Sequence, residues 1–304
     1  MEFLYILERF RMPVLNELML IITQLGEETA FLVIAMIVFW CVDKKKGYYL
    51  LFVGFLGTLA NQFLKLTCRV PRPWVRDPNF SILEQAREAA SGYSFPSGHT
   101  QSAVGTFGSL AAASDKKWWR WICILLAALV GFSRMYIGVH TPADVLVSVL
   151  IACVLILLLK EPVMNGEGRR MKLLIGLMLA CSVAFLLYVS LWKFPEDLDP
   201  HNYQSGLKNA YTILGALIGI AVVYVADRKW LDFSVSAVWW VQIIKVIVGL
   251  LLVLAVKEGL REPLELILPA YPARAVRYFL IVVVAGCIWP MSFGYWSKLG
   301  RKER

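Results

Sequence analysis

The sequence predicts an all-α, polytopic transmembrane helical bundle. Of the 304 residues, 59% are apolar and only 17% are charged, and the mean hydropathy is +0.63. The apolar residues are also gathered in segments long enough to cross the hydrocarbon core of a bilayer. In a typical soluble domain, a smaller share of the residues is apolar and about a quarter are charged. We therefore expect most of the chain to lie in a membrane.

Nine apolar segments are predicted to be membrane-spanning helices. In chain order they cover residues 29–41, 48–66, 98–113, 118–132, 143–159, 173–191, 210–226, 236–256 and 276–293. Residues 1–25 are a weaker candidate, because charged residues and Pro13 interrupt them, and we interpret them as an amphipathic or partly inserted helix. They lack the basic start, the compact apolar run and the cleavage site of a secretory signal, so we expect them to remain in the mature protein.

The basic residues of the connections predict on which side of the membrane each connection lies. Short cytoplasmic connections are enriched in Lys and Arg, and counting the spans places every basic cluster on one face. These clusters lie at residues 44–46, 116–120, 169–172, 228–229 and 298–304. The opposite, outer face then holds the connections 69–97, 133–141, 192–207 and 257–277. The net charge of +9 reflects this asymmetry, so no nucleic-acid partner is expected.

The cysteines and the changes in composition indicate the organisation of the chain. The six cysteines lie in or beside apolar segments without paired spacing, so we predict neither a disulfide framework nor a zinc site. A polar stretch at residues 161–171 separates a half that carries polar motifs from a half without comparable motifs. We therefore predict a catalytic core at residues 1–160 and a transmembrane extension of unknown role at residues 161–304.

Three polar motifs interrupt the apolar sequence on the predicted outer face. Ionisable groups near a bilayer are costly unless they are paired or functional. The first motif consists of Lys65, at the end of the second span, and Arg72-Pro73 in the following connection. Lys65 offers a point charge, and the Arg72 guanidinium can bind a phosphate through two parallel hydrogen bonds.

The second motif is Pro96-Ser97-Gly98-His99, at the predicted start of a helix. Backbone amides at a helix N-terminus bind anions, and the Ser97 hydroxyl is directed to the same place. His99, one step inside the helix, is placed to act as an acid or a base near neutral pH. The second motif therefore predicts a phosphate site with a proton donor beside it.

The third motif places Ser133-Arg134 at the outer end of one span and His140 just before the next, with Asp144 four residues further on. A carboxylate at this spacing can accept the proton on one imidazole nitrogen and leave the other nitrogen free to attack phosphorus. Phosphoryl transfer needs cations around the phosphate oxygens, a nucleophile and an acid for the leaving group. Together the three motifs supply each of these groups.

In order, spacing and identity, the three motifs resemble the signature of the type-2 phosphatidic acid phosphatase superfamily, and no signature position departs from it. The resemblance covers the first half of the chain. It implies a metal-independent phosphatase without a cofactor, whose six-helix core is followed here by about four extra transmembrane helices. By this resemblance, His140 is the nucleophile that forms a phosphohistidine, Asp144 is its partner and His99 is the leaving-group acid. The phosphate-binding residues that it implies are Lys65, Arg72, Ser97, Gly98 and Arg134.

Each motif also has a purely structural interpretation. The residues 141–144 have the pattern of a capped helix start, with Asp144 as a capping carboxylate, and Ser97 could be an ordinary N-cap. Lys65 and Arg134 could anchor helix ends at the membrane interface. None of these explanations accounts for the gathering of all three motifs on one face, so we prefer the functional interpretation.

Four further residues are weaker candidates for a functional role. Lys245 lies near the middle of a predicted span and is either functional or extends toward the interface. Arg69 and Arg76 could extend the basic cluster toward a second phosphate group, or they could be exposed to solvent. His201 lies in an acidic connection and is interpreted as an exposed loop residue.

The leading hypothesis is an integral-membrane phosphatase that hydrolyses a lipid phosphate or diphosphate at the outer bilayer surface. Undecaprenyl diphosphate is slightly preferred as the substrate, and phosphatidic acid and phosphatidylglycerol phosphate are also compatible. We expect a bacterial plasma membrane, with the site facing outside. The alternatives are a lipid phosphotransferase, in which another alcohol replaces water, a non-enzymatic lipid transporter and, more remotely, a vanadate-using oxidase.

Overall fold

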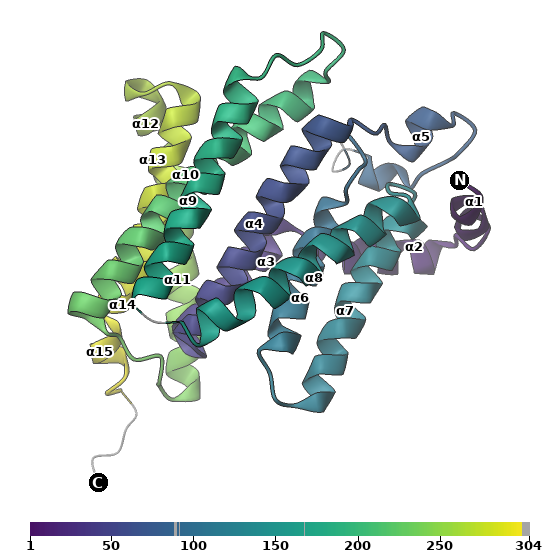
Figure 1. Cartoon of the computed structure of the whole chain (residues 1–304). Coiled ribbons are helices and arrows are strands. Elements are labelled where there is room, and N and C mark those ends of the chain that lie inside the picture. Colours follow the sequence, from purple (N-terminus) through teal and green to yellow (C-terminus); the bar gives the residue numbers. More distant parts are fainter. Residues whose placement is uncertain (88–89, 91, 167, 300–304) are drawn as a thin grey trace. The chain divides into compact units, whose positions relative to one another are not determined.

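Helices account for every regular element in the described part of the chain (Figure 1). The computed structural model describes residues 1–87, 90, 92–166 and 168–299. In these ranges, seven helices are long and apolar enough to cross a membrane, and four of them follow residue 168. An eighth span results if α2 (Pro13–Gln24) and α3 (Glu28–Cys41), which are bent by 51°, are taken together. The predicted all-α transmembrane fold with four additional spans is confirmed.

Every predicted apolar segment lies in a helix, although the helix ends differ by a few residues. After α3, the helices are α4 (Lys44–Cys68), α6 (Gly98–Ala112), α7 (Lys117–Tyr136), α8 (Pro142–Met164), α9 (Arg169–Leu191), α10 (Pro200–Ala226), α11 (Trp239–Gly259) and α13 (Ala270–Val283). The last segment continues from α13 through the π-helical turn η4 (Val284–Ile288) into α14 (Trp289–Met291). Helix α6 has only 15 residues, nine of them buried, so it is shorter than the seven candidate spans.

Short elements complete the chain between and after the long helices. They are α5 (Pro73–Arg76), η1 (Glu84–Ala86), η3 (Asp227–Leu231), α12 (Arg261–Ile267) and α15 (Phe293–Trp296). The elements α5 and η1 lie in the long connection between α4 and α6, which carries Arg72 of the first motif.

The N-terminal segment forms two helices, α1 (Glu2–Arg9) and α2, in place of the one helix expected. Pro13 starts α2, a position at which its missing N–H and fixed φ are tolerated. Between the two helices, Arg11 donates from Nε to the carbonyl of Tyr136 at 3.1 Å and from Nη1 to the carbonyl of Ser81 at 2.9 Å. These bonds attach the N-terminal helices to the end of α7 and to the α5–η1 connection.

The chain divides into two compact units, each built from three stretches of sequence. The first unit comprises Met1–Leu32, Tyr49–Glu161 and Lys193–Gly206. The second comprises Val33–Tyr48, Pro162–Trp192 and the chain from Leu207 onward. Because these spatial units interleave along the sequence, the functional boundary near residue 160 stays a prediction.

In the first unit, α7 packs against α6 and α2. The Tyr49 hydroxyl of α4 donates to the carbonyl of Ile156 in α8 at 2.6 Å. Large side chains on another face of α8 remain 63% to 75% exposed, among them Leu146, Leu150 and Leu157. A row of exposed leucines on an otherwise packed helix is the surface expected where a protein meets lipid.

In the second unit, α10 and α13 approach closely along small residues. A Cβ atom at Gly215 would lie 2.0 Å from the carbonyl oxygen of Ala275, and one at Gly219 would lie 2.8 Å from Cβ of Val282. Glycines four residues apart lie on one face of a helix, where they allow two membrane helices to pack backbone against backbone. Larger residues at these two positions would force α10 and α13 apart.

Candidate active site

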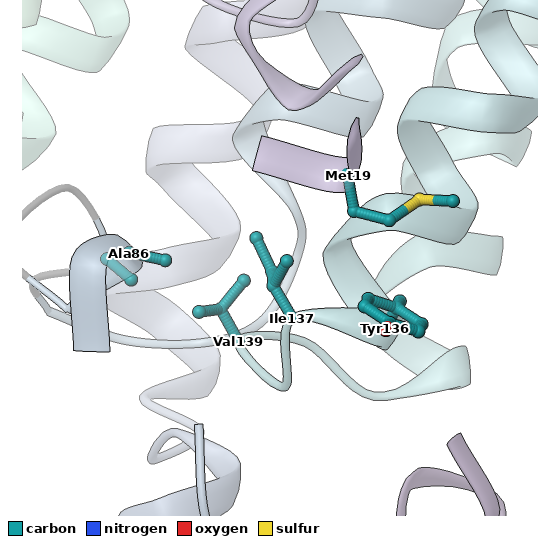
Figure 2. Packing of buried hydrophobic residues seen from close by; sticks show 6 residues of the cluster. Met19, Ala86, Tyr136, Ile137 and Val139 are labelled. Atoms are coloured by element: carbon teal, nitrogen blue, oxygen red, sulfur yellow. The ribbon is translucent and has the colours of Figure 1, made fainter. Parts of the chain in front are cut away.

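The connection between α7 and α8 fixes the position of His140. Gly138 in this connection has a φ of +89°, in the left-handed region that favours glycine. On both sides of it the chain is anchored in a buried apolar cluster (Figure 2). The members of the cluster are Met19, Ala86, Ala90, Tyr136, Ile137 and Val139. Because α2, the η1 region and α7 all contribute to this packing, the residue that follows the cluster has little freedom to move.

Arg72 selects the tautomer of His140. The Nη1 atom of Arg72 lies 2.9 Å from Nε2 of His140. A guanidinium has donors only, so Nε2 accepts this hydrogen bond and the ring proton of a neutral imidazole lies on Nδ1. The lone pair on Nε2 is therefore the nucleophilic position of the ring.

Asp144 and Ser94 face the other nitrogen of this ring. Oδ2 of Asp144 lies 3.6 Å from Nδ1 of His140, beyond hydrogen-bond length. The Ser94 hydroxyl donates to Oδ2 at 2.5 Å and lies 3.4 Å from Nδ1. Oδ2 also accepts the backbone N–H of Thr141 at 2.7 Å. Asp144 therefore caps the start of α8, as the structural interpretation predicted. In the same conformation, its carboxylate faces the imidazole of His140.

The surroundings of His140 favour its neutral form. The side chain is 2% exposed, and burial lowers the pKa of the imidazole well below its ordinary value; repulsion from Arg72, Arg134 and Lys65 lowers the pKa further. At neutral pH the ring is uncharged, so Nε2 can attack without first losing a proton.

Hydrogen bonds join the start of α6 to the start of α8. The Ser97 N–H donates to the carbonyl of Asp144 at 3.2 Å, and the Ser148 hydroxyl donates to the carbonyl of Ser97 at 2.9 Å. Ser97 is the N-cap of α6, and its Oγ accepts from the N–H and the hydroxyl of Thr100. Because Oγ is the acceptor in both bonds, the Ser97 hydroxyl keeps its own proton for donation to an anion. The N-terminus of α6 thus lies beside the third motif.

Gly98 adjoins open space at this helix start. The heavy atom nearest to an added Cβ would be Oδ1 of Asn61, at 3.9 Å. A side chain at position 98 would therefore meet no described protein atom closely, but it would fill the space in front of the α6 amides. This arrangement suits a ligand that approaches the backbone.

Lys65 and Arg72 are held by backbone carbonyls of neighbouring segments. Lys65 donates from Nζ to the carbonyl of Tyr93 at 2.6 Å. Arg72 donates from Nε to the carbonyl of Gly92 at 3.0 Å and from Nη1 to the carbonyl of Val139 at 3.0 Å. These bonds position both cations without neutralising their charge.

Arg134 is a buried cation with an unused donor. Its side chain donates from Nη1 to the Thr23 hydroxyl at 2.8 Å, and the residue is 2% exposed. Within the described residues, its Nε is buried and has no hydrogen-bond partner. A buried polar group without a partner costs about 1–3 kcal/mol, so a bound anion that accepted from Nε would recover this energy. Glu27 is the carboxylate that acts electrostatically on Arg134.

His99 lies in the first turn of α6 and is partly buried. Arg134, Arg72 and Lys65 are all close enough to act on it electrostatically. The bend between α2 and α3 covers its backbone, because a Cβ at Gly26 would lie 2.7 Å from the carbonyl oxygen of His99. The first unit thus gathers the predicted catalytic and phosphate-binding residues, which are Lys65, Arg72, Ser97, Gly98, His99, Arg134, His140 and Asp144.

Arg69 and Arg76, the candidates for binding a second phosphate group, make other contacts or are exposed. Arg69 donates from Nη1 to Oδ1 of Asp197 at 3.2 Å, and Arg76 is exposed at the end of α5. His201 is exposed, as expected. The contacts of Arg69 and Arg76 give no support to a second phosphate position.

Lys245 belongs to the second unit and not to this cluster. It is 1% exposed, and its Nζ donates to the carbonyl of Trp40 at 2.9 Å and to that of Val235 at 3.3 Å. Its ammonium also lies 4.0 Å from the centre of the Phe293 ring. These partners satisfy the cation within the protein, so its predicted accessory role gains no support.

Ser94 and Asn202 take part in the site although the motifs did not indicate them. Ser94 is fully buried, and its N–H donates to the carbonyl of Val70 at 2.8 Å. Asn202, in the first turn of α10, accepts the N–H of Tyr93 on Oδ1 at 3.1 Å. In the sequence, only the position of Ser94, two residues before the second motif, could have indicated a role in the site. Nothing in the sequence distinguishes Asn202 from its polar neighbours.

Two family models match the chain. The PAP2 superfamily model matches residues 46–165, which contain all three motifs. A second model, described as the transmembrane extension of PAP2 superfamily phosphatases, matches residues 211–301. The spans from α10 onward, which the motifs left without an assignment, therefore correspond to an extension found in the same superfamily.

Curated relatives match a little under half of the chain. Undecaprenyl-diphosphatase BcrC of Bacillus subtilis (strain 168) is 30% identical over 144 residues, which are 47% of this chain and 72% of the relative. Phosphatidylglycerophosphatase B of the same organism is 32% identical over 151 residues, or 45% of this chain and 69% of the relative. A probable sphingosine-1-phosphate phosphatase of Dictyostelium discoideum is 33% identical over 147 residues, covering 44% and 35% of the two chains. No solved structure matches the chain significantly.

The family models and the relatives agree with the geometry of the site. All three relatives carry the name of a phosphatase, and the two Bacillus proteins are matched over more than two thirds of their length. The matched region contains His140 and the cations around it. The chain belongs to the PAP2 superfamily, as a membrane-spanning phosphatase that carries the transmembrane extension of that superfamily.

Proposed function

We propose that this phosphatase hydrolyses a lipid phosphate or diphosphate on the non-cytoplasmic face of the membrane, through a phosphohistidine at His140. The observation that carries this proposal is the hydrogen bond from Arg72 to Nε2 of His140, which leaves the lone pair of a buried, neutral imidazole among three cations. One carboxylate, Asp144, faces the opposite nitrogen. The cluster thus combines a nucleophile with an excess of positive charge.

In the first step, Arg72 shifts its hydrogen bond from Nε2 of His140 to a phosphoryl oxygen, and the freed lone pair of Nε2 attacks phosphorus. The bond between phosphorus and the lipid oxygen, or the bridging oxygen of a diphosphate, breaks. Lys65, Arg72, Arg134, the Ser97 hydroxyl and the amides of α6 stabilise the charge on the phosphoryl oxygens. The charge of the bound phosphate offsets the repulsion of the three cations and so favours a proton on His99. His99 then gives this proton to the departing oxygen. The Nδ1–H of the phosphorylated ring is then stabilised by Asp144.

In the second step, water attacks the phosphorus of the phosphohistidine and the bond to Nε2 breaks. His99, which lost its proton in the first step, takes one from the attacking water. Phosphate leaves, and both histidines return to their starting states. The same residues therefore serve both steps, with His99 as acid and then as base.

The substrate is proposed as a class because the contacts describe only its phosphate end. The names of the relatives include an isoprenoid diphosphate and two lipid monophosphates. Arg69 is paired with Asp197, so the cluster offers no firm position for a second phosphate. A panel of undecaprenyl diphosphate, phosphatidic acid, phosphatidylglycerol phosphate and sphingoid phosphates, assayed for phosphate release by the purified chain, tests the proposal. An added acceptor alcohol distinguishes hydrolysis from transfer, and no release from any of these lipids would contradict the proposal.

Metal removal is expected to leave the activity intact. The cations that surround His140 are protein side chains, and in the described ranges no three His, Cys, Asp or Glu side chains are arranged to hold a metal ion. Phosphate release by the purified chain should therefore be the same, within about a factor of two, before and after treatment with EDTA. A loss of activity on EDTA treatment, restored by Mg²⁺ or Mn²⁺, would contradict this expectation.

Cysteine labelling tests the proposed side of the membrane. Asn79 and Asp115 are both exposed and lie in connections at opposite ends of the core helices. In a chain whose six native cysteines are replaced by alanine, a membrane-impermeant maleimide added to intact cells should label Asn79→Cys but not Asp115→Cys. Both should react after the cells are opened. Labelling of Asp115→Cys alone in intact cells would reverse the topology.

A further inference from the structure

A basic cavity lies in the second unit, apart from the residues assigned to catalysis. It has a volume of about 420 Å³ and is lined by α10, the end of α11, α12 and the start of α13. Helices α12 and α13 are neighbours in this unit (Figure 1). The lining includes Lys208, Lys257, Arg261, Arg274 and Arg277 together with two glutamates. Five cations in one cavity within a membrane extension require an explanation.

The two glutamates do not neutralise the inner part of the cavity. Glu258 lies 3.4 Å from Nζ of Lys257, and both side chains are about half exposed. Glu265 lies 4.0 Å from Nε of Arg261, and these side chains are also exposed. Both carboxylates are therefore engaged with cations at the rim. Exposed pairs of this kind are worth little and rearrange easily.

Arg274 and Arg277 line the cavity, and neither is ion-paired to a residue that the structure describes. Arg277 is 7% exposed, and within the described residues its Nε is buried without a hydrogen-bond partner. Arg274 donates from Nε to the Thr212 hydroxyl at 2.7 Å. Both guanidinium groups lie against the Tyr278 ring, at 5.2 Å and 5.9 Å from its centre. No salt bridge to a described carboxylate involves either arginine.

This geometry is incomplete without an anion. A buried guanidinium with an unused donor costs free energy unless a charged partner accepts from it. Two arginines side by side, with further cations at the rim, match the several oxygens of a phosphate group, which arginine binds through parallel hydrogen bonds.

The position of the cavity favours the headgroup of a lipid. Arg274 and Arg277 lie in the first two turns of a candidate span, Ala270–Met291, and so near the level of the headgroups. Tyr271 and Tyr278 also line the cavity, and tyrosine favours this level of the bilayer because one end of its ring is apolar and the other polar.

We propose that the transmembrane extension contains a second anion site, formed around Arg274 and Arg277, that binds the phosphate group of a lipid headgroup or free phosphate. It shares no residue with the His140 cluster, and it does not depend on the proposed phosphohistidine chemistry. The lining contains none of the residues assigned to catalysis, so we expect its occupant to be bound without being hydrolysed.

Native mass spectrometry of the full chain tests this site. His140→Ala protein in a neutral detergent is incubated with phosphatidylglycerol or, separately, with phosphatidylcholine of the same acyl chains, and the lipids that remain bound are counted. We expect retention of phosphatidylglycerol over phosphatidylcholine, and at least a tenfold lower retained fraction at one site in Arg277→Gln and in Arg274→Gln. Arg170→Gln, an exposed arginine at the start of α9, is the matched control and should retain as much lipid as its parent.

Competition with inorganic phosphate distinguishes the two sources of the anion. Displacement of phosphatidylglycerol by millimolar phosphate, in the parent and not in Arg277→Gln, assigns the site to the phosphate group alone. Retention against phosphate assigns it to the lipid headgroup. Arg274 is only partly buried, so Arg274→Gln keeps the test valid if Arg277→Gln does not fold. Equal retention by the parent and a folded variant, or equal retention of the two lipids, would overturn the proposal.

Discussion

Replacing His140 by alanine is expected to reduce phosphate release from a lipid phosphate by about 10³-fold or more. The substitution removes Nε2, the atom that Arg72 holds at 2.9 Å and that the proposed mechanism uses to form the covalent intermediate. The cations that would bind the substrate remain in place, so kcat should fall much more than KM rises. Steady-state phosphate release by purified protein, with a lipid monophosphate as substrate, measures both parameters.

The chain provides a matched control for this experiment. It contains only three histidines, His99, His140 and His201, and His201 is exposed. His201→Ala should therefore keep the activity of the parent within about a factor of two, since surface substitutions have small effects. Equal melting temperatures of the two variants would show that His140→Ala is folded. Full activity in folded His140→Ala would contradict the assigned nucleophile.

Replacing Asp144 by asparagine is expected to cost about 10²- to 10⁴-fold in kcat. The amide oxygen can still accept from Ser94 and Thr141, which bond to Oδ2 in the parent, so the start of α8 should be preserved. The negative charge that faces Nδ1 is lost, and the phosphorylated imidazole loses its stabilising partner. Single-turnover measurements should show slower formation of the phosphorylated protein, with binding of substrate little changed.

Ser94→Ala distinguishes the contribution of the Asp144 charge to catalysis from that of the orientation of its carboxylate. The Ser94 hydroxyl holds Oδ2 at 2.5 Å, so its removal should loosen the carboxylate and cost about 10- to 100-fold, as for other groups that orient a catalytic residue. The effect should be smaller than that of Asp144→Asn, because the charge remains. If Ser94→Ala were as damaging as Asp144→Asn in folded protein, orientation and not charge would be the main contribution of this carboxylate.

The site was predictable from sequence because its residues are unusual where they occur. Lys65, Arg72, Arg134 and His140 lie within or close to the ends of apolar segments, and a charged residue beside a bilayer is rare without a function. The spacing of His140 and Asp144 depends only on the local start of α8, which the sequence already indicates through Thr141-Pro142. The fold class was predictable for a similar reason, since the length of the apolar segments matches the thickness of the hydrocarbon core that they cross.

Other parts of the structure depend on contacts between distant segments. Asn202 lies 109 residues after Tyr93, whose N–H it accepts, and no local pattern relates the two. Helix α6 is apolar overall, and the sequence alone does not show that its polar residues, among them Thr100 and Gln101, are buried in the core of the first unit. Lys245 was a functional candidate only because it lies near the middle of a predicted span. The carbonyls that accept hydrogen bonds from its ammonium group belong to Trp40 and Val235, outside its helix.

The phosphorylated intermediate is the most direct test of the proposed mechanism. Purified chain is mixed with a lipid substrate carrying ³²P in its terminal phosphate, quenched with alkali within milliseconds and digested. We predict a label that is stable to alkali and labile to acid, on the peptide that contains His140, in an amount approaching one phosphate per active site. The label should be absent from His140→Ala and present in His201→Ala. Release of labelled phosphate by the parent without any label on His140 would contradict the mechanism.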